Sequence, residues 1–343
     1  MTDPNIQARY FLLGFEAIYG FPIDLVREIE PRWIWQVRTP HGHACLKVFR
    51  KRDQAYTSAQ AGHYLHERGF RFTPGVIPTK DGDLVARPTG ITDPPWWITL
   101  TEWIPGGTPY YLSKSGRDLA QAARILADFH VAIRGFRPWP GDLCVERWIL
   151  SWERIHLLTE LAEEAIKTEQ RPEFCERLKE GLSRYRPLVD QRLERAVAAR
   201  DLYAAAVEAE KSRGAQRHGD LNAGNFLIGE DCMMLIDLAQ IEPGLRIVRD
   251  VGNLAWAFSA SDAEIERAMV AYHQQAPLSP EEVELLPIVN DPVCNWGGLI
   301  DGYLSGDWTQ QMFVAGYDGC VKGPERFAHG LAVAASALRR IVT

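Results

Sequence analysis

The chain changes character at Pro105-Gly106-Gly107, and this change limits the folds that are open to it. Before it, from Leu25 to about Ile104, short β-type runs alternate with turn residues, whereas the segments after it are long and have the apolar period of helices. A chain of 343 residues exceeds one small core, since domains usually have roughly 100–200 residues. We therefore expect two lobes, residues 1–104 and residues 105–343, with a hinge at about residues 101–107.

The N-terminal lobe is expected to be a small antiparallel sheet with one helix. The runs Ile34–Val37 and Ala44–Phe49 flank a Pro/Gly turn and predict a hairpin. Lys47 lies on its second strand, on the face opposite to Leu46 and Val48. The other elements expected here are a helix over about Gln54 to Glu67 and strands over Leu84–Ala86 and Trp97–Ile104.

The C-terminal lobe is expected to be mostly helical, which makes the fold class α+β. Asp118 to Ile133 has a 3.6-period apolar stripe that predicts one buried face, with His130 packed on or beside it. Further helices are expected from about Trp148 to Lys211, with breaks near Pro172 and Pro187. Two capping boxes predict the starts of later helices: Ser261 with Glu264, and Ser279 with Glu282.

Composition and charge exclude several classes of protein. A formal net charge of -7 and a pI near 5.8 argue against nonspecific binding to nucleic acid or to an anionic membrane, because both need a positive field. The six cysteines form no CxxC pair, which favours a reduced, cytoplasmic chain. No signal peptide and no apolar run of about 20 residues is visible, so we expect a soluble protein, with deposition on a larger assembly left open.

The segment from His218 to Asp237 combines a base and two oxygen ligands at the spacing that phosphoryl transfer requires. In His218-Gly-Asp220-Leu-Asn-Ala-Gly-Asn225, Asp220 is the candidate to accept the proton of a substrate hydroxyl. Asn225 and Asp237 offer oxygen atoms to Mg²⁺, a hard cation. His218 is expected to orient the loop rather than to react.

A predicted hairpin explains how the two ligands meet. Phe226–Ile228 and Met233–Ile236 flank Gly-Glu-Asp231, and Asn225 and Asp237 are equidistant from Asp231. Antiparallel pairing about this residue would place the two ligands side by side. The alternative is an ordinary surface loop, because turns of the His-Gly-Asp type are common.

The same motif, with Lys47 on its strand, resembles the aminoglycoside phosphotransferase and choline kinase superfamily, from Leu25 into the C-terminal helices. Short segments resemble the CotS spore coat group most closely, with type II homoserine kinases next: Trp33–Thr39, Leu46–Phe49, Ile77–Gly82 and Leu100–Gly106. The resemblance implies a bilobal protein-kinase-like fold. It also implies an ATP- and Mg²⁺-dependent phosphotransferase that acts on a hydroxyl of a small molecule such as an amino alcohol, an amino acid or a sugar.

By this resemblance Lys47 would bind the α- and β-phosphates of ATP, with a surface lysine on an edge strand as the alternative. Glu102, Trp103 and Ile104 resemble the linker whose backbone binds adenine, and the alternative is simply the last strand of the sheet. Asp250 matches the acidic residue that steadies the catalytic loop, or it caps a helix.

Three departures from the family pattern leave a second hypothesis open. Asp237 is followed by Leu-Ala-Gln240 rather than by an aromatic residue, and residues 56–60 contain no glutamate to pair with Lys47. Arg27–Trp33 contains no glycine-rich phosphate loop. The second hypothesis is a spore coat or morphogenetic protein that keeps the fold, has coat proteins as partners and turns over little.

Overall fold

The computed structural model describes residues 14–30, 33–87, 96–113, 116, 118–137, 145–169, 171–290, 293–306, 316–317 and 324–342. The chain divides into two compact units, and each unit is formed from two stretches of sequence. Unit 1 comprises Met1–Gly141 and Gly214–Pro243, and unit 2 comprises Asp142–Arg213 and Gly244–Thr343. The β-rich segment and the segment from His218 to Asp237 therefore belong to the same unit. The lobe boundary between residues 104 and 105 stays a prediction.

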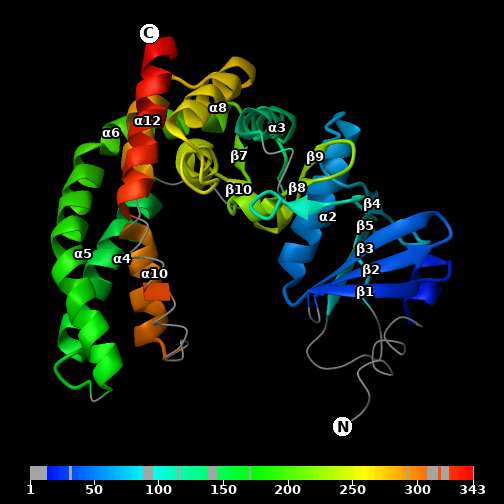
Figure 1. The fold of residues 1–343 in the computed structure, drawn as a ribbon, viewed down its shortest axis with the longest axis horizontal. Helices are drawn as coiled ribbons and strands as arrows, with labels where there is room; N and C mark the ends of the chain where they lie inside the picture. The colour runs from blue at the N-terminus through cyan, green and yellow to red at the C-terminus, as the bar shows by residue number, and fades with distance from the viewer. Residues whose placement is uncertain are drawn as a thin grey trace. The chain divides into compact units, whose positions relative to one another are not determined.

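Unit 1 is built on a five-stranded antiparallel sheet of order β1-β2-β3-β5-β4 (Figure 1). The strands are β1 (Asp24–Glu30), β2 (Ile34–Thr39), β3 (Gly42–Phe49), β4 (Val76–Ile77) and β5 (Trp97–Glu102). The predicted hairpin is confirmed, because β2 and β3 pair from Ile34↔Lys47 to Thr39↔Gly42. Gly42 closes its turn with a φ of 116°, a conformation that favours glycine.

The two faces of β3 separate a hydrophobic core from a polar side. Ala44, Leu46 and Val48 are buried in the core of the sheet. Cys45 and Lys47 alternate with them and point to the other face, as the period of a strand requires. The predicted orientation of Lys47 relative to Leu46 and Val48 is confirmed.

Helix α2 (Arg52–Glu67) follows β3 and confirms the predicted helix. The predicted strand over Leu84–Ala86 is wrong, since only Ala86 forms a bridge, to Ile98 of β5. The physical reason is that β4 already pairs with Thr101 and Leu100 of β5. The segment around Ala86 therefore has only the far end of β5 to pair with.

The rest of unit 1 connects this sheet to the segment from His218 to Asp237, called the motif segment below. Helix α3 (Leu119–Ala132) begins at Asp118, whose carboxylate accepts hydrogen bonds from the N–H groups of Ala120 and Gln121. Its predicted apolar stripe is buried throughout, including His130 at 3% exposure. Short strands complete the unit: β6 (Thr108–Pro109), β8 (Phe226–Ile228) and β9 (Met233–Leu235) in one sheet, and β7 (Gln216–Arg217) with β10 (Glu242–Pro243) in another.

Unit 2 is helical in the part that the structure describes (Figure 1). Its elements are α4 (Val145–Ala165), α5 (Pro172–Ala198), α6 (Arg200–Ser212), η3 (Ile247–Val251), α7 (Gly252–Leu254), α8 (Asp262–Gln275), α9 (Pro280–Val289), α10 (Val293–Leu304) and α12 (Pro324–Val342). The predicted break near Pro172 is confirmed, whereas the predicted break near Pro187 is wrong because α5 continues through it. Tyr185 and Val189 on either side of Pro187 are fully buried, so packing holds the helix together there.

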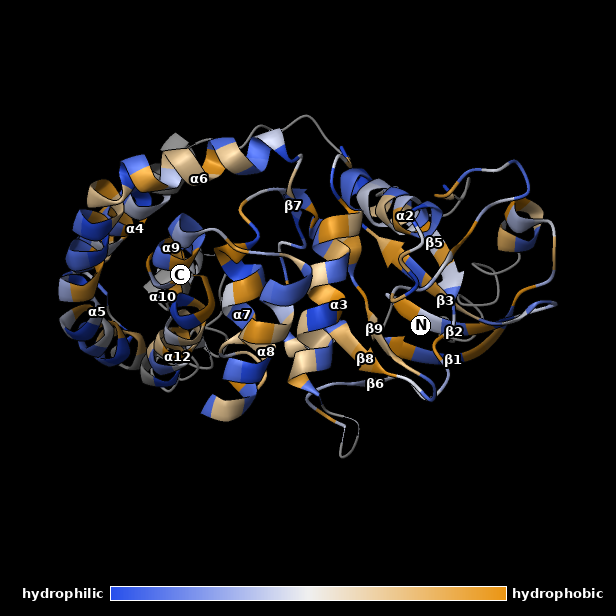
Figure 2. Cartoon of the chain, turned by 90° about the horizontal axis from the view of Figure 1, so that it is seen from above, coloured by the Kyte–Doolittle hydropathy of each residue, from blue (hydrophilic) through white to orange (hydrophobic). Residues whose placement is uncertain are grey.

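Local sequence signals account for several features of unit 2. Both predicted capping boxes are confirmed: Ser261 N–H donates to Glu264, and Ser279 N–H donates to Glu282. Figure 2 shows hydrophilic and hydrophobic residues in turn along α6, whose buried residues Tyr203, Ala206, Val207 and Glu210 recur at the spacing of one helix face. Trp296 of α10 stacks on Tyr185 of α5 with ring centroids 4.9 Å apart, which joins the two helices.

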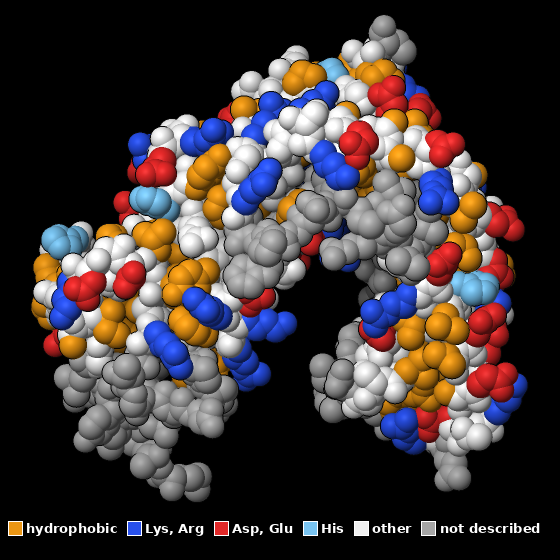
Figure 3. All heavy atoms as spheres, turned by 180° about the vertical axis from the view of Figure 1, so that it is seen from behind, with side chains coloured by type: hydrophobic (Ala, Val, Ile, Leu, Met, Phe, Trp, Pro, Cys, Tyr) orange, Lys and Arg blue, Asp and Glu red, His pale blue; other side chains and the backbone are white. Residues whose placement is uncertain are grey.

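The described surface is mixed in charge. On the face shown in Figure 3, acidic and basic side chains are interspersed. Within the described ranges, no helix combines the length and the apolar character that crossing a membrane would need.

Candidate active site

The motif segment begins with a turn that only glycine can form. Gly219, between His218 and Asp220, has a φ of 82°. A Cβ added to Gly219 would lie 2.3 Å from the carbonyl oxygen of Gln240, which is closer than atoms approach in proteins. The glycine therefore lets the loop pass directly against the segment that follows Asp237.

Side chains of the loop hold its own backbone. The amide of Asn225 donates from Nδ2 to the carbonyl oxygen of Asp220 at 2.7 Å, and Asn222 Nδ2 donates to the same oxygen at 3.1 Å. Asn222 Oδ1 in turn accepts from the N–H of Gly224 at 2.7 Å. With Nδ2 of Asn225 used in this way, its other amide atom, Oδ1, is the one that remains to act as a ligand.

The hairpin is present, but its predicted register is wrong by one residue. Phe226 pairs with Leu235, and the N–H of Ile236 donates to the carbonyl oxygen of Asn225 at 2.8 Å. Asn225 therefore lies opposite Ile236 rather than Asp237. The cause is a two-residue loop, closed by the Gly229 N–H on the Cys232 carbonyl, whose centre lies half a residue before Asp231.

His218 is fully buried and connects the loop to the hairpin. Its Nε2 atom lies 3.0 Å from the carbonyl oxygen of Ile236, so this nitrogen is the donor. The ring packs edge-on against Phe129 of α3, with centroids 5.9 Å apart. The hydrogen bond fixes the backbone immediately before Asp237, and the ring contact holds the imidazole in place.

Asp237 forms an ion pair with Lys47, although 190 positions separate the two residues. Lys47 Nζ donates to Asp237 Oδ1 at 2.6 Å, and the side chains are 26% and 34% exposed. Asp237 is left-handed, with φ 64° and ψ 59°, a conformation that costs energy outside glycine and concentrates at functional sites. Helix α2 offers Ser58 and Gly62 to the same cavity, so the carboxylate partner of Lys47 comes from the hairpin rather than from the helix.

These residues line a cavity of about 730 Å³ in unit 1, a size that accommodates a small ligand. Predicted site residues on its wall are Lys47, Glu102, Trp103, Ile104, Asn225 and Asp237. His218 and Asp220 precede Asn225 in the same loop and are not among the lining residues of this cavity. Asp250 is fully buried in unit 2, within η3, and the N-cap position of α7 is Val251.

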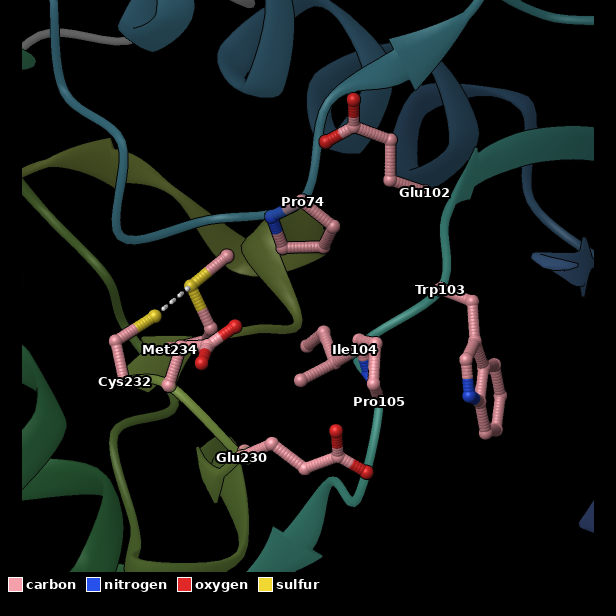
Figure 4. A pocket seen from close by; sticks show the side chains of 10 residues that line it. Pro74, Glu102, Trp103, Ile104, Pro105, Glu230, Cys232 and Met234 are labelled. Atoms are coloured by element: carbon pink, nitrogen blue, oxygen red, sulfur yellow. Dashed lines mark hydrogen bonds between the residues drawn. The ribbon is translucent and has the colours of Figure 1, made fainter. Parts of the chain in front are cut away.

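The predicted linker leaves the sheet at Glu102, where β5 ends. Trp103 and Ile104 are therefore not part of the last strand. The Glu102 carboxylate accepts a hydrogen bond from the N–H of Gly75 at 2.9 Å, and the N–H of Glu230 donates to the Pro105 carbonyl at 3.0 Å. Figure 4 shows a second, smaller cavity here, with Trp103 and Ile104 projecting to opposite sides of the linker.

Sequence reasoning missed the polar residues beside Lys47. Cys45, Thr99 and Thr101 also line the cavity, and the register pairs Cys45 with Thr101 and Lys47 with Thr99. Burial raises the pKa of the Cys45 thiol, although the ammonium group of Lys47 opposes this effect. The signal that could have found these residues is strand period, because every second residue of β3 and β5 faces the same side as Lys47.

The donor atoms at this end of the cavity fit a magnesium ion. Asp237 supplies a carboxylate and Asn225 an amide oxygen, both of which are hard oxygen ligands. In the described part of the chain, no cluster of three or more His, Cys, Asp or Glu residues suits a metal ion. A site with two protein ligands is typical of Mg²⁺ that is also held by nucleotide phosphates.

The sheet, the linker and the hairpin belong to a protein-kinase-like α+β fold, as solved structures show. An aminoglycoside phosphotransferase from Alicyclobacillus acidocaldarius is 18% identical with a TM-score of 0.67, covering 95% of this chain and 96% of that one. A spectinomycin phosphotransferase in complex with ADP and spectinomycin is 12% identical with a TM-score of 0.64, covering 96% and 98%. A microcompartment-associated aminopropanol kinase is 15% identical with a TM-score of 0.52, covering 97% and 95%.

Residues 28–285 match the phosphotransferase enzyme family, which amounts to most of the chain. The chain therefore belongs to this family. The match includes Lys47 and extends through the hairpin to α9, so it spans both parts of the candidate site.

Proposed function

We propose that this protein is an ATP- and Mg²⁺-dependent phosphotransferase that transfers the γ-phosphoryl group to a hydroxyl of a small molecule. The acceptor classes that we propose are amino alcohols, amino acids and sugars, and the named substrates of the similar structures, spectinomycin and aminopropanol, support a small acceptor. The observation that carries the proposal is the contact of Lys47 Nζ with Asp237 Oδ1 at 2.6 Å. It joins the sheet to the hairpin within one cavity that also contains Asn225.

In this proposal the linker binds the base and Lys47 binds the phosphates. The N–H groups of Trp103 and Ile104 donate to no described residue, so they are available to the edge of an adenine ring. Lys47 Nζ would exchange its contact with Asp237 for the α- and β-phosphate oxygens. The ammonium group is a point charge on a flexible stem, which suits it to such an exchange.

Asp237 and Asn225 would hold the magnesium ion. When bound, the ion neutralises charge on the phosphates during transfer. Asn225 keeps its Nδ2 on the Asp220 carbonyl at 2.7 Å, so the ligand and the proposed base are held by the same loop. Asp220 would accept the proton of the acceptor hydroxyl, and the buried His218 would orient the loop through Ile236.

The test is ATP consumption by the full chain with a panel of amino alcohols, amino acids and sugars. At least one acceptor class is expected to stimulate turnover. Asp220→Asn is expected to lower kcat by about 10²–10⁴-fold, the usual contribution of a general base. The matched control is Asp201→Asn, at an exposed aspartate in the first turn of α6, which is expected to leave kcat unchanged.

The second candidate is a structural role in a spore coat, as the segments similar to the CotS group predict. The observation that favours it is the absence of a carboxylate on α2 beside Lys47, where Ser58 and Gly62 line the cavity. Binding of ATP with Mg²⁺ but no turnover on any acceptor, together with an unchanged cellular phenotype of Asp220→Asn, would support this role and contradict catalysis.

A further inference from the structure

Arg27 of β1 is held in a defined position at the wall of the cavity. Its Nε donates to Gln36 Oε1 at 2.8 Å, and its Cζ lies 5.7 Å from the centroid of the Trp103 ring. Gln36 is only 8% exposed, and its Nε2 lies 3.0 Å from Nδ1 of His43. A buried amide thus anchors the guanidinium group from one side, and the linker tryptophan packs against it from the other.

The register of the sheet places Arg27 at the linker end of the cavity. Arg27 pairs with Gln36, Gln36 with Cys45, and Cys45 with Thr101, which precedes the last residue of β5. Lys47 pairs with Thr99, two residues farther from the linker. Along a strand, two residues span roughly 6.6 Å, so Arg27 and Lys47 occupy successive rows of the sheet.

The chemistry of Arg27 suits the nucleoside part of a nucleotide. Nη1 and Nη2 of Arg27 donate to no described residue, and the side chain lines the cavity together with Trp103. A guanidinium group is planar and weakly hydrated, and it stacks on aromatic rings while donating hydrogen bonds from its edge. A purine base bound at the linker would stack on the guanidinium plane of Arg27. The ribose of the same nucleoside would accept hydrogen bonds from Nη1 and Nη2.

Resting on the proposed function, we propose that Arg27 binds the base and ribose of the nucleotide, whereas Lys47 binds its phosphates. The segment from Arg27 to Trp33 contains no glycine-rich loop to close over the ligand. In the absence of such a loop, the Arg27 side chain covers the nucleoside part of the ligand. It is therefore a determinant of affinity for the nucleoside, independent of the number of phosphates.

The test compares adenosine, AMP and ADP with Mg²⁺ by calorimetric titration of the full chain. Arg27→Ala is expected to weaken the binding of all three by the same factor, about tenfold, the size of a partly shielded cation–π contact. Lys47→Ala is expected to weaken ADP and leave adenosine unchanged. Gln36→Leu, which keeps Arg27 but removes its anchor, is expected to weaken all three by less than Arg27→Ala does.

The control is Arg38→Ala, since Arg38 is an exposed arginine on β2 that does not line the cavity. Unfolding midpoints of all variants are measured alongside, and Arg27→Lys, which keeps the charge without the planar group, replaces Arg27→Ala if the latter does not fold. Unchanged affinities, or a loss for ADP but not for adenosine, would overturn the inference. If the unaltered chain binds no adenine nucleotide at all, the proposed function fails, and this inference fails with it.

Discussion

Two ion pairs, one in each unit, use the same chemistry in different surroundings. Lys47 and Asp237 in unit 1 are 26% and 34% exposed and lie on the wall of a cavity. Arg246 and Glu282 in unit 2 are 3% and 2% exposed, and Arg246 also donates to the carbonyl oxygens of Ala276 and Pro277. Under the proposed function the first pair opens to admit a nucleotide, whereas the polar atoms of the second pair are engaged by one another and by the backbone.

The electrostatics of the second pair agree with a structural role. Burial alone would lower the pKa of Arg246, but the neighbouring groups, with Glu282 and Glu210 among them, outweigh it and raise the pKa above its ordinary value. Nε of Arg246 lies 3.7 Å from Glu210 Oε2, so one cation serves two buried carboxylates. Exposure, rather than the chemistry of the pair, therefore distinguishes the candidate site of unit 1 from the buried ion pair of unit 2.

The largest effect is expected on phosphotransfer, when the Lys47–Asp237 pair is removed. Asp237→Ala should lower phosphotransfer on the order of 10³-fold or more, because it removes the carboxylate that would hold the magnesium ion at the phosphates. Its unfolding free energy should change by no more than about 1 kcal/mol, as is usual for a half-exposed pair. Kinetics and urea unfolding of the same preparation measure both quantities. A large loss of stability with intact turnover would show that the Lys47–Asp237 pair serves the fold rather than the reaction.

The buried pair should show the reverse behaviour. Arg246→Met leaves Glu282 buried without its cation, whereas Glu210 keeps its pair with Arg213, so the unfolding free energy should fall by about 3–5 kcal/mol. Urea unfolding followed by circular dichroism measures this loss. A change below about 1 kcal/mol would show that the buried carboxylates become hydrated or protonated in the variant at little cost in free energy. Burial would then not explain why this pair stabilises the fold.

A third ion pair, Glu169 with Arg171, should make the stability of unit 2 depend on pH. Glu169 accepts hydrogen bonds from Arg171 and from the hydroxyl of Tyr303, and mainly the bond from Arg171 lowers its pKa from 4.5 to about 2. Because the folded-state pKa is depressed, its contribution to stability is complete above pH 4.5 and is lost as the pH falls toward 2. Glu169→Gln should therefore lower the unfolding midpoint at pH 7 and by less at pH 3. An equal difference at both values would contradict this assignment.

The smallest effect is expected at an exposed pair. Arg154 donates to Asp301 at 2.7 Å, but the side chains are 66% and 46% exposed. Arg154→Ala should change the unfolding free energy by less than about 1 kcal/mol, since water competes for both charges. It is the matched control for Arg246→Met, because both variants remove an arginine from an ion pair of unit 2. A loss of unfolding free energy as large as that of Arg246→Met would show that exposure does not determine how much an ion pair contributes to stability.

Local patterns in the sequence predict much of the fold. The alternation along β3, the stripe of α3 and the capping boxes at Ser261 and Ser279 each depend on neighbouring residues, and each is confirmed. The errors arise where contacts between residues far apart in the sequence determine the secondary structure. Pro187 stays helical because Tyr185 and Val189 are buried against other helices, and Ala86 forms a single bridge because β4 holds the edge of β5.

The candidate site shows the same limit. His218, Asp220, Asn225 and Asp237 were recognisable from their spacing, but the register of the hairpin depended on a loop of two residues rather than three. The partner of Lys47 was not predictable, because Asp237 is 190 positions away and no local pattern links the two. Arg27 was missed because its position depends on pairing across two strands.

The central claim is that the Lys47–Asp237 contact marks a site for a nucleotide with its magnesium ion. The most direct measurement is a calorimetric titration of ATP, with and without Mg²⁺, into the unaltered chain and into Asp237→Asn. We predict that Mg²⁺ strengthens ATP binding to the unaltered chain and that this gain disappears in Asp237→Asn. Binding that is the same with and without Mg²⁺, or a gain that persists in Asp237→Asn, would contradict the claim.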